Sequence, residues 1–150
     1  MSRADERHDI TIEEYIASIN DEGTKKDART LYEVMQHISG EEPILYGIGT
    51  IGFGVYSYEY ESGRKGESHT LGFYPRKGKI TIYLTDGTKR YSDLLSTLGK
   101  HITTGYCLYI KQLSDIKLPV LTTILEKSYQ NIESQSKAGP INHILWQAED

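Results

Sequence analysis

The sequence predicts a single α+β domain, with an antiparallel-rich sheet and helices packed on one face. Apolar residues recur at helical spacing in four segments, whereas in the middle of the chain they alternate as they do in strands. The predicted order, ααβββαβα with short connections, is typical of this fold class. A length of 150 residues suits one domain. We expect a disordered lead-in over 1–10, the domain over 11–133 and a C-terminal tail over 134–150.

The helices are predicted from their apolar stripes and their terminal residues. They cover 12–19, a stretch from about Asp27 to Ile38, 91–98 and 119–132. Thr11 and Glu14 have capping-box spacing at the start of the first helix. A polar break over 20–24 separates the first two helices. Gly40 and Gly99 are expected to end the second and third, and Pro119 suits the first turn of the last.

Strands are predicted where β-branched and aromatic residues alternate with polar ones. They cover 51–60, 70–74, 79–84 and 105–110. Ile51, Phe53 and Val55 share one parity on the first strand. With the aliphatic residues of the later strands, they form the face that should meet the helices.

The opposite face of the sheet is predicted to be rich in tyrosine. The chain has twelve tyrosines against two phenylalanines. The tyrosines expected on this face are Tyr56, Tyr58, Tyr60, Tyr83 and Tyr109. Such a face suits recognition of a ligand or protein, because each ring is apolar in body and polar at its tip. Cross-strand pairs that stabilise a solvent-facing sheet explain the pattern equally well.

A basic cluster near the end of the third helix is the candidate binding edge. Lys100 and His101 follow Gly99, which is expected to end the third helix. Cations at this position interact favourably with the helix dipole, and this alone could explain them. The candidate anion-binding residues are Arg64, Arg76, Lys100, His101 and Lys111. Such cations bind phosphate or carboxylate, and His101 would titrate near neutral pH.

The glycines from Gly47 to Gly52 match the pattern G-x-G-x-x-G but do not indicate a nucleotide site. A dinucleotide site requires a helix after the glycines, whereas a strand follows here. The companion kinase motifs are absent. We expect these glycines to permit a bend or a close backbone approach.

Composition restricts the function classes further. The net charge of −4 combines an acidic segment 1–42 (eleven acidic, five basic) with a basic segment 62–111 (nine basic, three acidic). A pI near 5.7 argues against nucleic acid as a partner.

No apolar run is long enough to span a membrane and no secretory signal is visible, so a cytoplasmic protein is expected. No nucleophile elbow or metal-spaced Cys/His cluster occurs, and His101 with Cys107 is the only Cys/His couple close in sequence.

Several motifs together resemble the YdhG-like domain family of unknown function. They lie at 51–54, 58–64, 72–77, 98–101 and 107–111, and the resemblance covers residues 11–133. It implies a small intracellular protein with a compact α+β fold. Ile102-Thr103-Thr104 and Tyr106 depart from the family, where a Lys-Thr-Gly-Lys-Ser run is expected. This departure removes two positive charges beside His101.

Two functions are expected from these observations. The first is a non-enzymatic binding module for a small anionic ligand or a protein partner, without a cofactor and with possible homo-oligomerisation. The alternative is implied by a frataxin-like branch of the family: iron binding or iron delivery. In that case the candidate metal ligands are Asp5, Glu6, Asp9, Glu13 and Glu14. An enzyme that uses His101 or Cys107 has the least support.

Overall fold

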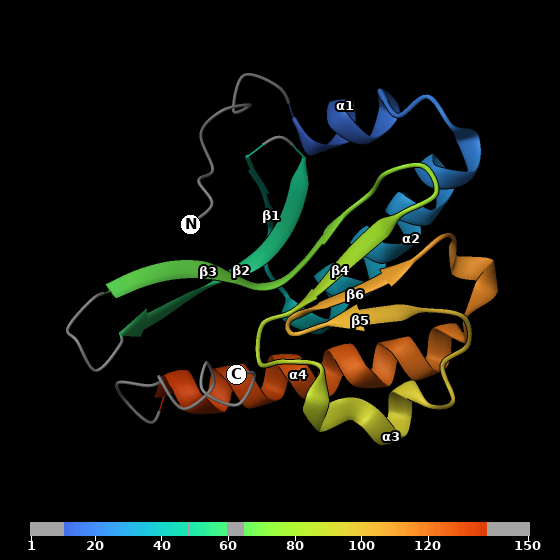
Figure 1. Ribbon diagram of the computed structural model, residues 1–150. Coiled ribbons are helices and arrows are strands. Elements are labelled where there is room, and N and C mark those ends of the chain that lie inside the picture. The colour runs from blue at the N-terminus through green and yellow to red at the C-terminus, as the bar shows by residue number, and fades with distance from the viewer. Residues whose placement is uncertain (1–10, 48, 60–64, 138–150) are drawn as a thin grey trace.

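The computed structural model describes residues 11–47, 49–59 and 65–137, without the side chains of 56–59, 65–68 and 135–137 (Figure 1). Its helices are α1 (Ile12–Ala17), α2 (Glu22–Ser39), α3 (Ser92–Leu95) and α4 (Leu118–Lys137), and its 3-10 turns are η1 (Lys89–Tyr91) and η2 (Leu113–Asp115). Its strands are β1 (Pro43–Tyr46), β2 (Thr50–Glu59), β3 (Lys65–Tyr74), β4 (Ile80–Leu84), β5 (Ile102–Thr104) and β6 (Cys107–Ile110). The predicted α+β class is confirmed.

The strands form one antiparallel sheet in the order β1-β2-β3-β4-β6-β5. The two strands that the sequence did not predict, β1 and β5, are the two edges of this sheet. They contain four and three residues, and β1 begins at a proline. Such short segments show almost no alternation, and they form because a longer neighbour provides a pairing edge.

One face of the sheet packs on α2 and α4, as predicted. The sheet contributes Ile51, Phe53, Leu71, Phe73, Ile80, Ile82, Leu84, Leu108 and Ile110 to a single buried cluster. The helices contribute Ala28, Leu31 and Met35 from α2, and Leu121, Ile124 and Leu125 from α4. The two helices also bond to each other, because the Tyr129 hydroxyl donates to the Ser39 carbonyl at 3.2 Å. In Figure 1, α2 lies behind the sheet and α4 runs along its lower side.

Helix α2 begins earlier than predicted. Asp21 is its N-cap and accepts a hydrogen bond from the Thr24 backbone N–H at 3.0 Å. This bond lowers the pKa of the Asp21 carboxyl. The expected polar break over 20–24 is therefore the cap and first turn of the helix. Aspartate is favoured at this position because it pairs with an otherwise unsatisfied backbone N–H.

The prediction for Val55 is wrong. Its side chain is 55% exposed and does not face the helices. The alternation of buried and exposed side chains is interrupted at Gly54, which has φ 81°, lies against the Thr70 side chain and is left out of the β2–β3 register. Beyond that point His69, the register partner of Val55, packs on the face opposite Leu71. A left-handed backbone that glycine adopts readily thus turns the following residues to the other face.

The glycines of the G-x-G-x-x-G match lie at the turn between β1 and β2 and in β2 itself, and no helix follows them. Gly49 lies against Tyr15, whose hydroxyl donates to the Gly49 carbonyl at 2.9 Å. A Cβ at Gly49 would come within 2.4 Å of that hydroxyl oxygen. The expected close backbone approach is confirmed at this position.

Candidate anion-binding site

A hollow of about 730 Å³ lies at one end of strands β4, β6 and β5. The residues that line it include Lys79, Lys100, His101, Ile102, Tyr109 and Lys111. Four of these six residues were predicted as binding residues from the sequence. Lys79 and Ile102 were not, although both lie at strand ends. The hollow joins part of the predicted basic edge to the predicted tyrosine face, since Tyr109 lines it together with Lys100, His101 and Lys111.

The strand register brings three lysines side by side. Ile80 pairs with Ile110, so Lys79, one residue earlier, lies across from Lys111, one residue later. Ile102 pairs with Tyr109, so Lys100 and Lys111 are each two residues beyond a paired position. All three line the same hollow. The ends of three neighbouring strands therefore carry a row of ammonium groups.

These charges are not neutralised within the part of the chain that the structure describes. None of the three ammonium groups makes an ion pair there, whereas Lys25, Lys77 and Arg90 do. The one carboxylate that lines the hollow, Asp115, accepts a hydrogen bond from the Gln112 amide at 3.2 Å. Three positive charges that line one hollow make its electrostatic potential positive, so the hollow favours an anion.

Tyr109 holds one of the lysines over the sheet. The Lys79 ammonium lies 4.8 Å from the centre of the Tyr109 ring, a cation–π contact. The Tyr109 hydroxyl is 3.5 Å from the Thr104 hydroxyl on the neighbouring strand. This arrangement places a cation directly above an aromatic surface.

Gly99 positions the Lys100 and His101 backbone. At φ 124° it forms a bridge with Ile116, and the Lys100 N–H donates to the Asp115 carbonyl at 3.2 Å. The His101 Nδ1 is 2.7 Å from the Gly99 carbonyl oxygen, so it donates to that oxygen. The other ring nitrogen, Nε2, is then the one that can bind a ligand.

Substitution of Gly99 with alanine is expected to destabilise the fold by about 2–4 kcal/mol. The new Cβ would lie 2.5 Å from the Asp115 carbonyl oxygen, in a backbone conformation that L-residues rarely adopt. Gly40→Ala is the control, because Gly40 has φ 68° and no atom within 4 Å of an added Cβ. Urea unfolding should show a clearly larger loss for Gly99→Ala. Equal losses would mean that the close approach at Gly99 has no cost.

The other predicted binding residues are not in this hollow. Arg76 lies with its guanidinium 4.4 Å from the centre of the Tyr74 ring and donates to the Thr81 hydroxyl at 3.0 Å. Tyr83 packs against the His69 ring, with centroids 5.0 Å apart. Arg64 and Tyr60 lie outside the described residues. Tyr56 and Tyr58 belong to β2, but their side chains are outside the described part.

His69 is a buried residue that the sequence analysis missed. Its ring lies between those of Tyr46 and Tyr83 and against the paired glycines Gly52 and Gly72. Among the described residues nothing bonds to its Nδ1. Burial lowers the pKa of His69 from 6.5 to about 4, because the charged ring would lose its hydration. No sequence signal marks this position, since an isolated histidine in a strand does not indicate burial.

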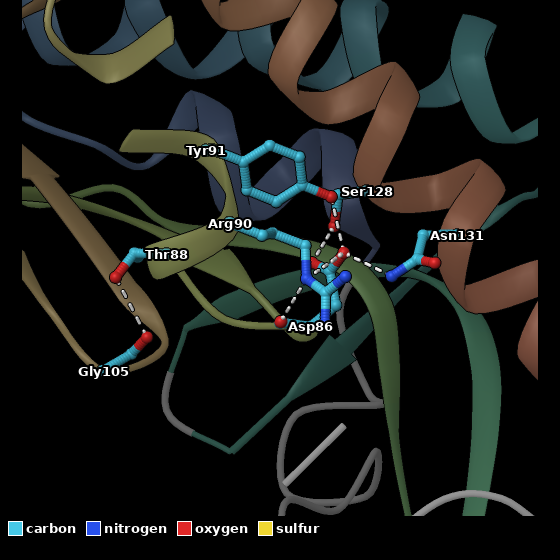
Figure 2. A network of polar contacts seen from close by, with 7 residues as sticks. All are labelled: Asp86, Thr88, Arg90, Tyr91, Gly105, Ser128 and Asn131. Carbon is cyan, nitrogen blue, oxygen red and sulfur yellow. Dashed lines mark hydrogen bonds and ion pairs between the residues drawn. The ribbon is translucent and has the colours of Figure 1, made fainter. Parts of the chain in front are cut away.

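A second buried group is Asp86, two residues after the end of β4. Its carboxylate accepts hydrogen bonds from the side chains of Tyr91, Ser128 and Asn131, at 2.5, 2.6 and 2.9 Å (Figure 2). Arg90 adds an ion pair at 3.7 Å. Burial and then the adjacent carboxylate raise the pKa of Tyr91. These hydrogen bonds connect the segment after β4 to α4. Because Asp86 is 1% exposed, a ligand has no access to its carboxylate.

The alternative metal site can be followed only in part. Asp5, Glu6 and Asp9 lie outside the described residues. Glu13 and Glu14 are exposed on α1, and Glu14 accepts a hydrogen bond from the Thr11 N–H in the predicted capping box. Within the described ranges no group of three or more His, Cys, Asp or Glu residues could hold a metal ion.

His101 and Cys107 do not form a catalytic couple in this hollow. His101 lines it, whereas Cys107 does not. Cys107 is half-buried in β6, across from Tyr83 and Thr104. The described helices include none with the length and apolar character needed to cross a bilayer.

Comparisons with family models, with curated proteins and with solved structures find no match to this chain. The resemblance to YdhG-like domains therefore stays a prediction from the sequence motifs.

Proposed function

We propose that the chain is a binding domain for a small anionic ligand, and that the hollow at the ends of β4, β5 and β6 is its site. The observation that carries the proposal is the row formed by Lys79, Lys111 and Lys100, without an ion pair in the described part of the chain. Evenly spread surface lysines are ordinary, but three that line one hollow in a protein of net charge −4 are not.

The surrounding groups suit this role. His101 presents Nε2, because its Nδ1 is bonded to the Gly99 carbonyl. The ammonium groups provide charge, and Nε2 of the histidine donates a directional hydrogen bond to an anion when the ring is protonated. Among the residues that line the hollow, His101 bonds through Nδ1 to the Gly99 carbonyl and Asp115 bonds to Gln112, so the two do not form an acid–base pair with each other, and this supports binding rather than catalysis.

Inorganic phosphate is the simplest probe of the site. Sodium phosphate should raise the melting temperature of the wild-type chain above that in sodium chloride of equal ionic strength, because a ligand that binds only the folded state stabilises it. Lys100→Gln/Lys111→Gln should lose most of this shift.

A charge-matched control makes the test specific. Lys89→Gln/Lys127→Gln removes the same charge from exposed positions on η1 and α4 that do not line the hollow. This variant should keep the wild-type shift. The proposal fails if both double variants respond to phosphate as the wild-type chain does, or if phosphate and chloride act alike on the wild-type chain.

A further inference from the structure

The hollow contains an apolar surface next to its cationic row. Ile102 begins β5 and is the register partner of Tyr109 in β6, and Lys100 and Lys111 lie just outside these two strands. The three lysines, Ile102 and Tyr109 all line the one hollow. The Lys79 ammonium lies over the Tyr109 ring, 4.8 Å from its centre.

Ile102 is the exposed apolar side chain of this hollow. Its side chain is 68% exposed, and with Val55 it is one of two exposed large hydrophobic residues in the described part of the chain. It lines the same hollow as the lysines. Tyr109 beside it is only partly buried. Because the Lys79 ammonium lies over the Tyr109 ring, Ile102 supplies the apolar surface of the hollow, and a compact inorganic anion would leave this surface exposed to water.

From this juxtaposition we infer that the ligand is a ring-bearing organic phosphate: its phosphate binds Lys79, Lys100 and Lys111, and its ring lies on Ile102, beside Tyr109. This inference rests on the proposed function and adds the ligand class. Three ammonium groups also suit a dianion better than a carboxylate.

Phenyl phosphate is the probe, and inorganic phosphate, benzoate and phenol are its comparisons. Titration calorimetry on the full chain should show phenyl phosphate binding about tenfold or more tightly than phosphate, because the ring loses contact with water. Benzoate should bind more weakly than phenyl phosphate, since it carries one negative charge. Phenol, which lacks the anion, should bind more weakly than either.

Two variants separate the ring contact from the charge contact. Ile102→Ser replaces an exposed side chain and should leave phosphate affinity unchanged while it removes most of the advantage of phenyl phosphate. Lys100→Gln/Lys111→Gln should weaken both ligands.

Each negative result has a distinct meaning. If phosphate binds through the lysines but phenyl phosphate binds no more tightly, or if Ile102→Ser leaves the ratio unchanged, the ring inference is overturned and the anion site stands. If neither ligand binds the wild-type chain, both proposals fail. If phenyl phosphate binds equally to the lysine double variant, the anion site is refuted.

Discussion

Replacement of Asp86 with alanine is expected to destabilise the protein by about 3–5 kcal/mol, because it leaves buried hydrogen-bond donors without an acceptor. The hydroxyls of Tyr91 and Ser128 and the amide of Asn131 all donate to this carboxylate. Ser128 is fully buried and Tyr91 is 5% exposed, so water cannot readily take the place of the lost oxygens. Urea unfolding followed by far-UV circular dichroism measures the loss.

Two further variants test whether the hydrogen bonds cause this effect. Asp86→Asn keeps one acceptor oxygen and the side-chain size, so we expect an intermediate loss of about 1–3 kcal/mol. Asp93→Ala removes an exposed carboxylate from α3 and should change stability by no more than about 0.5 kcal/mol. A loss for Asp86→Ala no larger than that for Asp93→Ala would contradict a structural role for the network.

The same network shows where sequence patterns stop being informative. Asp86-Gly87 indicates a turn, and a turn does follow β4. However, Ser128 lies 42 residues away, and its position in α4 gives no sign that it faces an aspartate. Buried polar partners come from tertiary packing, which local propensity does not encode. The helix stripes and long strands were predictable because each carries its own periodicity.

The candidate site, too, was predictable from the sequence only in part. Lys100, His101 and Lys111 stand out as cations at element ends, and the structure places all three in one hollow. Lys79 joins them because β4 pairs with β6, a neighbour relation between strands that are not consecutive in the chain. The same pairing puts Tyr109 beneath Lys79. Arg76 was predicted as a binding residue, but it stacks on Tyr74 and lies outside the hollow.

Acid is expected to destabilise the fold through His69. The folded state keeps this histidine neutral down to about pH 4, whereas in an unfolded chain it titrates near 6.5. Between these pH values the unfolded chain binds a proton that the folded chain does not, so stability falls as the pH is lowered. The contribution of the neutral His69 to the stability of the fold is fully present above about pH 6.5. About 3 kcal/mol should be lost by pH 4.

The effect can be isolated by replacing the ring. His69→Phe retains an aromatic side chain between Tyr46 and Tyr83, which are uncharged in this range, and it removes the unbonded Nδ1. The difference in unfolding free energy between the wild-type chain and this variant should therefore change by about 3 kcal/mol from pH 7 to pH 4. His37→Gln, on an exposed turn of α2, is the control and should change little. Carboxylates titrate in all three proteins, so the comparison cancels their contribution. If the wild-type chain and His69→Phe show parallel pH profiles, the histidine is not held neutral by burial, and the aromatic face around it is open to water.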